Sequence, residues 1–307
     1  MAIRIPGPRN SRALVSLMLL LSVTAGGIFL SLNSHMPLWV LGQMILTCTM
    51  WAWFSVLHSC GHRAYFKQQK MNSIVGHLAS LITFVPFFSW KHHHNLHHRW
   101  TGWKELDPSS NETPDEPLPV KWTNFFDLCW KLWLPIFSLS HAMTNFWNPI
   151  RMNQVLPDRK RRIQSLFSQA LIVVYIGSFL LLEPVLFLKI YGLSLTLFLV
   201  MSDPVLLSQH IALPVYTTES QVVKPFKDHN KFCRTITFGK AIDRMVLLNF
   251  NLHSVHHEYP SVAHYDLHTI SYEPAHHVSF TQWVKWSKSQ SVRDLIWPNG
   301  KNGEKHA

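Results

Sequence analysis

The sequence predicts an all-α integral membrane protein with four transmembrane helices in two hairpins and a cytosolic helical cap that holds a histidine-rich dimetal site. Only 15% of its 307 residues are charged and 47% are hydrophobic, whereas ordinary soluble domains carry about 25% charged residues. Four apolar runs are each close to the roughly 20 residues that a bilayer-spanning helix needs. Clusters of histidine adjoin these runs, and together the three observations favour a membrane protein with a polar, metal-binding part.

The first hairpin is predicted from two apolar runs near the N-terminus, at residues 13–32 and 37–57. The first run is too long for the apolar core of a signal peptide, so we expect a retained helix. The preceding residues 1–12 carry three arginines and are expected to form a basic tail. The positive-inside rule places this tail on the cytosolic side, and His58, at the exit of the second helix, returns to the same side.

A third apolar segment, residues 73–90, is interrupted by His77 and Pro86 and is shorter than a normal span. We predict an interfacial or re-entrant helix here, because a full crossing would need a longer run. This prediction keeps His58 and His94 on one side of the membrane, as a shared metal site requires.

The second hairpin is predicted over residues 165–188 and 191–209, with Lys189 alone marking the turn. Asp203-Pro204 interrupts its second helix, and a carboxylate at that depth is expected to face a cavity or a partner. His210 follows this helix, so it is predicted to lie at the same cytosolic exit as His58.

The remaining residues, 91–164 and 210–307, are predicted to form the cap of one membrane domain that comprises residues 1–307. Within this cap we expect a surface loop over 105–119, an interfacial helix over 122–147 and an apolar-patterned helix over 240–257.

Charge and cysteine content exclude other classes of protein. The net charge of +11 favours an anionic lipid surface, since the chain is hydrophobic and has no zinc-finger or helix-turn-helix pattern that would indicate nucleic acid. None of the four cysteines forms a CxxC pair, so reduced thiols facing the cytosol are expected. Cys60, inside the first histidine cluster, is expected to be a small buried side chain rather than a ligand.

Three histidine clusters carry the chemistry: His58-Ser-Cys-Gly-His62, His94-Asn-Leu-His97-His98 and His253-Ser-Val-His256-His257. Positions i, i+3 and i+4 share one helix face, so each cluster can direct imidazoles to one point. Neutral imidazole binds iron, zinc, copper or nickel. Eight such nitrogens exceed the four ligands that one zinc ion takes, so two metal ions are predicted.

These clusters resemble the three histidine boxes of the membrane-bound fatty acid desaturase family, in spacing, in order and in their position after apolar hairpins. The flanking segments that follow His62, precede Lys91 and follow His256 are most similar to the acyl-lipid Δ12-type branch. In that family the segment that matches Gln209-His210 contributes a further ligand. One departure is Ser59, where many members carry a carboxylate that can orient a neighbouring ligand.

The resemblance implies an enzyme that uses two iron ions, O₂ and two electrons to introduce a double bond into a fatty acyl chain, with zinc as a substitute metal in purified protein. It assigns the reaction to the metal centre itself, with no separate acid or base. No HPGG motif of a fused cytochrome b5 is found, so a separate electron donor of the ferredoxin or cytochrome b5 type is expected. The expected metal ligands are His58, His62, His94, His97, His98, His210, His253, His256 and His257.

Two other functions share parts of this pattern. A carotenoid ketolase or hydroxylase would carry the same boxes, and a histidine-rich metal carrier would need histidines within its spans. A soluble diiron protein is disfavoured, because the paired Glu and Glu-x-x-His helices are missing. Apart from His210, six histidines outside the boxes are expected not to bind metal: His92 and His93 adjoin box two, whereas His264, His268, His276 and His277 are predicted at the surface. Asn249 and Asn251 are expected to pack or cap.

Overall fold

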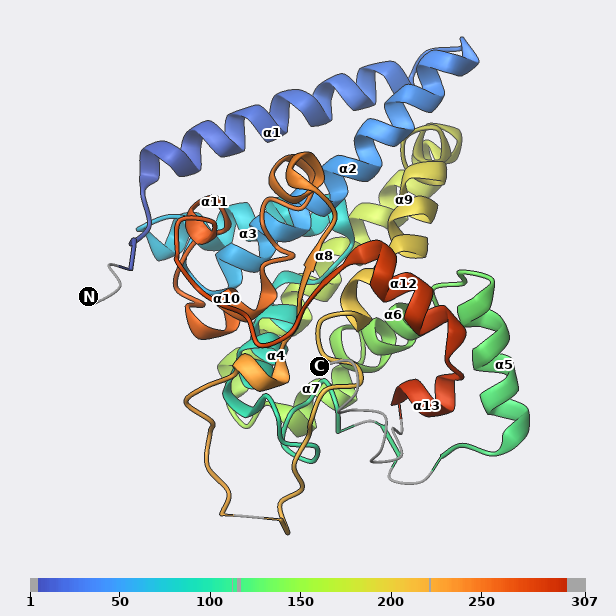
Figure 1. Cartoon of the computed structure of the whole chain (residues 1–307). Helices are drawn as coiled ribbons and strands as arrows, with labels where there is room; N and C mark the ends of the chain where they lie inside the picture. Colours follow the sequence, from blue (N-terminus) through green and yellow to red (C-terminus); the bar gives the residue numbers. More distant parts are fainter. Residues whose placement is uncertain (1–4, 112, 115–116, 221, 297–307) are drawn as a thin grey trace.

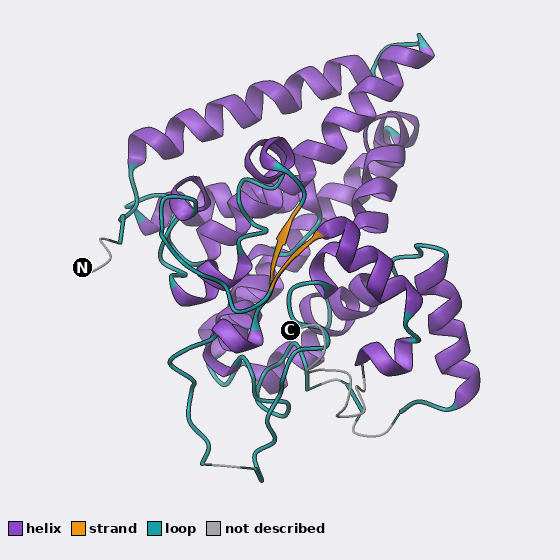
Figure 2. Ribbon diagram, viewed as in Figure 1, coloured by secondary structure: helices purple, strands orange, loops and turns teal. Residues whose placement is uncertain are grey.

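The computed structural model describes residues 5–111, 113–114, 117–220 and 222–296; Arg4 of the predicted basic tail lies outside them. Helices make up most of this part of the chain, with one parallel pair of short strands (Figures 1 and 2). The elements are α1 Asn10–Ser31, α2 Met36–Gly61, α3 Gln69–Thr83, α4 Phe87–Trp100, α5 Val120–Lys131, α6 Ile136–His141, η1 Ala142–Phe146, α7 Pro149–Val155, α8 Arg159–Leu182, α9 Pro184–Leu207, η2 Asn230–Phe232, β1 Thr235–Thr237, η3 Ile242–Val246, α10 His253–Glu258, α11 His264–Leu267, β2 His277–Ser279, α12 Phe280–Ser289 and α13 Val292–Ile296.

Four helices of the described chain, α1, α2, α8 and α9, are 22 to 26 residues long and apolar enough to cross a bilayer. The predicted membrane-embedded, helical fold class is therefore confirmed. Helix α2 continues past the predicted end at residue 57 to Gly61, so His58 lies in its last turn and not beyond it.

Helix α2 is the central element of the fold. Within its apolar part 67% of the residues are buried in the protein, compared with 22% to 33% in the other three long helices. It packs against α1, α3, α4 and α9, and its Trp53 and Leu57 are fully buried. The histidines at its end are therefore attached to the most constrained helix of the molecule.

The second hairpin turns earlier than the sequence predicted. Helix α8 ends at Leu182 and α9 begins at Pro184, so the turn is at Glu183 and not at Lys189. Proline lacks the N–H that would continue α8, and it fits the first position of a new helix. Lys189 instead lies on α9, where its ammonium group donates to the carbonyl of Leu32 at 3.2 Å.

The predicted third segment, 73–90, is divided between α3 and α4, which meet at an angle of 104°. Phe84 ends α3 in the left-handed conformation (φ 57°), and Pro86 precedes the first residue of α4. This bend has the shape of a re-entrant or broken span, and it directs α4 with its histidines back along α2.

Gly76 allows α3 and α4 to approach at this bend. A Cβ atom at position 76 would lie 2.4 Å from the ring of Phe87, inside the range that real contacts allow. We expect Gly76→Ala to destabilise the protein by about 1–3 kcal/mol, because the buried ring must move. Thermal unfolding in detergent should show a lower Tm, while Gly177→Ala, with no neighbour within 4 Å, should not. Equal unfolding temperatures for the two variants would contradict this packing.

Two long helices predicted for the cap are broken. The segment 122–147 forms α5, α6 and η1, because Trp133 adopts a positive φ of 60° and Pro135 follows it. The segment 240–257 forms η3 and α10, because Leu248 and Asn249 both have positive φ. Consequently α10 is a separate short helix whose direction is set independently of η3.

Several contacts attach the cap to the long helices. Asp203 on α9 accepts hydrogen bonds from the backbone N–H groups of Phe137 (3.1 Å) and Ser138 (2.6 Å), as expected for a buried carboxylate that faces a partner. Arg9 and Arg12, at the start of α1, form ion pairs with the buried Asp266 of α11. The N-terminal end of α1 therefore lies at the same end of the helices as the cap.

Candidate metal centre

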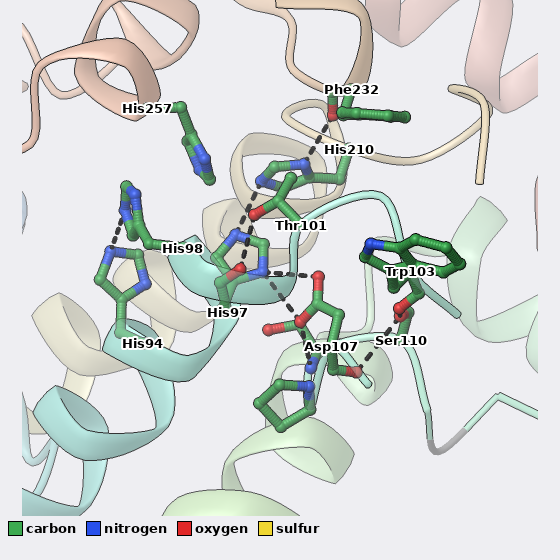
Figure 3. A network of polar contacts seen from close by, with 12 residues as sticks. His94, His97, His98, Thr101, Trp103, Asp107, Ser110, His210, Phe232 and His257 are labelled. Carbon is green, nitrogen blue, oxygen red and sulfur yellow. Dashed lines mark hydrogen bonds and ion pairs between the residues drawn. The ribbon is translucent and has the colours of Figure 1, made fainter. Parts of the chain in front are cut away.

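The structure brings all nine predicted histidines together as two groups whose candidate ligand nitrogens lie within 4.8 Å of one another. The five-histidine group contains His58, His62, His94, His98 and His256. The four-histidine group contains His97, His210, His253 and His257. Helix α2 and His62 directly after it, helices α4 and α10, and the segment after α9 supply these side chains. Figure 3 shows His94, His97, His98, His210 and His257.

Each HxxHH motif is divided between the two groups, which differs from the expectation that a motif points to one spot. On α4, His94 and His98 are four residues apart and face the five-histidine group, while His97 faces the other. On α10 the arrangement is reversed, so that His253 and His257 face the four-histidine group and His256 the other. The i, i+4 pair shares a face, and the remaining histidine is rotated by one residue, about 100°.

Ring nitrogens converge at short distances within both groups. In the five-histidine group, Nε2 of His98 lies 3.0 Å from Nε2 of His94 and 3.0 Å from Nε2 of His256. In the four-histidine group, Nε2 of His210 lies 3.2 Å from Nε2 of His97 and 2.7 Å from Nε2 of His253.

The hydrogen bonds around His97 and His210 test whether these nitrogens fit a metal ion. Nδ1–H of His210 donates to the carbonyl of Phe232 at 2.9 Å, and a carbonyl can only accept, so Nε2 of His210 presents a lone pair. Nδ1–H of His97 donates to the carboxylate of Asp107 at 2.8 Å, so its Nε2 also presents a lone pair. Two lone pairs that face each other at 3.2 Å are both satisfied by a cation, and the donor set fits one.

His257 is oriented by His229, which the sequence did not single out. Nε2–H of His229 donates to the carbonyl of Phe226 at 3.1 Å, which leaves its Nδ1 as an acceptor. Nδ1 of His257 lies 3.4 Å from that atom and can donate to it, so Nε2 of His257 is left free to bind. Nε2 is buried and has no hydrogen-bond partner within the described residues.

The environment keeps His62, His210 and the three histidines of α10 neutral, the form that binds a metal. Burial, together with nearby His97, lowers the pKa of His210 to about 3, and burial with Lys91 and His97 lowers that of His62 to about 3. Burial followed by repulsion from neighbouring imidazoles holds the pKa values of His253, His256 and His257 well below the usual value. At neutral pH these rings retain their lone pairs.

Asp107 lies beside the four-histidine group. The sequence predicted a surface loop here, and for Asp107 that prediction is wrong because the residue is buried. Its carboxylate is buried and accepts from Nδ1 of His97 and from the backbone N–H of Ser109. Burial acts to raise the pKa of Asp107, but the adjacent His97 and these hydrogen bonds outweigh it and lower the pKa. The ionised carboxylate therefore fixes the tautomer and orientation of His97.

Most remaining histidines lie outside both groups, as expected. His92 contacts Gln164 and His93 contacts the carbonyl of Pro108, each at 3.2 Å, and His268 and His277 are exposed. His264 and His276 were predicted at the surface, and this is wrong because both are buried.

The other polar residues beside the boxes have structural contacts. Asn249 and Asn251 donate to the carbonyls of His264 and Ile236, in agreement with a packing role. Cys60 is buried and belongs to neither group.

A cavity of about 730 Å³ adjoins the histidines. Its lining is largely apolar and comes from α2, the end of α3, α4, α5, α6, η1, α8, α9, α10 and α13. His58 and His94 of the five-histidine group and His97, His210 and His253 of the other line its wall. An apolar cavity with a few convergent polar groups is the usual form of a binding site for a small apolar ligand.

Comparison with known proteins identifies the same region. The sequence model of the fatty acid desaturase family matches residues 34–283. An sn-1 oleoyl-lipid 12-desaturase from Picosynechococcus sp. is 28% identical over 80% of this chain and 64% of its own length. The sn-1 acyl-lipid omega-3 desaturase (ferredoxin) of Nostoc sp. is 25% identical over 78% of this chain and 69% of its own.

A third relative is the acyl-lipid omega-3 desaturase (cytochrome b5) of Arabidopsis thaliana endoplasmic reticulum, 26% identical over 75% of this chain and 62% of its own. Across these and a further curated relative, the chain spans between 50% and 69% of the relative's length.

Proposed function

We propose that this chain, which belongs to the fatty acid desaturase family, introduces a double bond into a fatty acyl chain. The observation that carries the proposal is the pair of histidine groups beside an apolar cavity. Matching histidine boxes alone would also suit a carotenoid ketolase or hydroxylase. The relatives described above are named as acyl-lipid desaturases, which favours an acyl substrate.

The nine histidines would hold two iron ions, one in each group, with zinc as a substitute in purified protein. When bound, the irons supply the chemistry by which O₂, two electrons and two protons remove two hydrogens from the acyl chain, giving a double bond and two molecules of water. Purified protein should accordingly contain about two metal ions per chain.

The chain's own residues bind and position the substrate. Apolar side chains such as Phe84, Phe187 and Leu199 line the cavity away from the boxes, where they would hold a hydrocarbon by excluding water. The histidines face the same cavity, so an acyl chain in it would pass beside both groups. A fixed depth of insertion would select the bond that reacts.

The proposed reaction consumes two electrons that the acyl chain and O₂ do not supply. We propose a separate donor of the ferredoxin or cytochrome b5 type, since relatives are named for each. The chain would act as one membrane domain over residues 1–307, with membrane lipid around its four long helices.

We further propose that both termini and both histidine groups lie on the cytosolic side. The attachment of the start of α1 to the cap through Arg9 supports this, because it joins the N-terminal tail to the histidine end of the molecule. The C-terminal residues 297–307 lie outside the described part of the chain.

Labelling of single cysteines in a Cys48→Ser background tests the orientation. Cysteines placed at the exposed Ser34 and Glu183 should react with an impermeant maleimide in intact cells. Cysteines at the exposed Glu105 and Lys240 should react only after the membrane is permeabilised. Reaction at position 105 in intact cells would mean that α3 and α4 together cross the membrane.

Lipid analysis of cells that express the chain tests the activity, with His97→Ala as the inactive comparison. New unsaturated acyl chains that depend on His97 support the proposal. Oxidised carotenoids would point to the ketolase or hydroxylase, and metal uptake without either product would point to a carrier.

A bulky residue inside the cavity should separate substrate binding from metal binding. Ala142 lines the cavity, and we expect Ala142→Trp to reduce desaturation at least about tenfold by occupying space that the acyl chain needs. Metal content should be unchanged, because residue 142 belongs to neither histidine group. Ala170→Trp, on the exposed face of α8, is the matched control. Normal products from Ala142→Trp would show that the substrate does not use this cavity.

A further inference from the structure

The two histidine groups differ in how their rings are supported. In the four-histidine group, His97, His210 and His257 each have a partner outside the group for the ring nitrogen that faces away. Among the described residues, no ring of the five-histidine group forms a hydrogen bond to any residue outside that group. Metal-binding histidines generally donate their other N–H to a carboxylate, a carbonyl or a water molecule. The five-histidine group therefore lacks a protein partner that its chemistry calls for.

A small cavity lies beside this group. Its volume is about 10 Å³, and its polar lining includes His58 and His256 of the group together with Ser55, Ser59 and His264. Such a volume is about that required for one water molecule, and a water site needs two to four polar partners. The cavity lies where α2, α10 and α11 meet, on a different set of residues from the large apolar cavity apart from His58 and Phe250.

His264 is fixed at the wall of this cavity. Its side chain is buried, with Nδ1 3.0 Å from Oγ of Ser59, and its backbone N–H donates to the same oxygen at 3.3 Å. The side chain of Asn249 donates to its carbonyl at 2.9 Å. Nε2 of His264 is buried and forms no hydrogen bond of good geometry among the described residues, although the ring also lies near the backbone carbonyl of Ser55. A polar nitrogen held in this way implies a partner in the cavity.

We propose that His264, held by Ser59, binds one water molecule in this cavity, and that this water hydrogen-bonds the rings of His58 and His256. His264 is thereby a positioning residue for the five-histidine metal site, in the role that Asp107 has for His97. The inference rests on the proposed metal-binding function of this group.

The geometry also explains how a serine can replace a carboxylate at position 59, next to the expected ligand His58. Its hydroxyl is directed to His264 and lines the cavity. A carboxylate at position 59 would extend further into the same space and could accept from a ligand ring directly. Ser59→Asp should therefore make the water and His264 less necessary.

The test uses the purified full chain loaded with metal, and measures both the metal content and the rate at which a chelator removes each ion. His264→Leu removes the ring nitrogens, His264→Gln keeps a hydrogen-bonding group, and His268→Leu is the exposed histidine control. We expect His264→Leu to release one of the two ions about 10- to 100-fold faster, with a smaller effect on the other ion. His264→Gln should retain most of the wild-type behaviour, and Ser59→Asp should restore slow release to the His264→Leu variant.

Other outcomes would overturn the inference. Suppose that the wild-type protein and His264→Leu both hold two ions and release each ion at the same rate as one another. His264 then has only a packing role, even if its replacement lowers the Tm. Equal acceleration in the Leu and Gln variants would also contradict a hydrogen-bonding role. If the wild-type protein binds no metal, the proposed function fails and the inference fails with it, and these results are distinguished by the wild-type measurement.

Discussion

Replacing His210 with alanine should abolish desaturation and lower the metal content from about two ions per chain to about one, because the four-histidine group would lose one of its four donors. His210 belongs to no histidine box, yet its Nε2 atom lies 2.7 Å from Nε2 of His253 and 3.2 Å from Nε2 of His97. The bond from its Nδ1–H to Phe232 holds the ring in this orientation. Alanine removes the nitrogen and leaves the backbone unchanged.

A different role for His210 would give a different result. A histidine near the C-terminal end of α9 can stabilise the helix dipole when it is charged, which contributes about 0.3–1 kcal/mol. The environment opposes that role, since burial lowers the pKa of His210 to about 3 and keeps the ring neutral. If His210→Ala retains full metal and near-normal activity with a slightly lower Tm, His210 is a helix cap and not a ligand.

The control for this experiment follows from the structure. His264 would be a poor choice, because it is buried beside Ser59. His268 is exposed and lies in neither histidine group, so His268→Ala should keep both metal and activity.

Asp107→Asn should weaken metal binding at the four-histidine group by about 10- to 100-fold, with a comparable fall in activity at limiting metal. The amide has the same shape, so packing is preserved, but it removes the negative charge that orients His97 and increases the basicity of its Nε2 atom. If the asparagine directed its NH₂ group to Nδ1 of His97, it would favour the tautomer with the proton on Nε2, which cannot bind a metal through Nε2. Titration with zinc or cobalt against a competing chelator measures the effect without requiring turnover.

Glu105→Gln is the matched control, because Glu105 is an exposed carboxylate in the same loop and bonds to the backbone of Thr218. It should leave metal affinity unchanged. Equal affinities for Asp107→Asn and the wild type would show that the carboxylate supports only the loop, through Ser109.

The long helices could be predicted because an apolar run of sufficient length has few alternatives in a bilayer. The turn at Glu183 was missed because Lys189 received more weight than the Glu183-Pro184 pair, although proline is the stronger helix signal. The break at Trp133 has a similar signal in Pro135, two residues later. The break at Leu248 has none, since leucine does not favour a positive φ.

The candidate site, like the fold, could be predicted only in part from the sequence. Spacing identified the boxes, and the resemblance added His210, but the partners of the ligands depend on contacts between distant segments. His229 and His257 are 28 residues apart, and Ser59 and His264 are 205 apart. Asp107 is only ten residues from His97, but a carboxylate in a segment rich in proline and serine resembles an ordinary loop. Burial alone distinguishes it, and burial is a property of the fold.

The division of each HxxHH motif between two groups has a consequence for how the metals are loaded. Helices α4 and α10 each contribute side chains to both groups. An ion bound in one group restrains both helices, and thereby lowers the conformational entropy that remains to be lost when the second ion binds. Occupancy should therefore be positively cooperative. At limiting metal, molecules with no ion and with two ions should predominate over those with one.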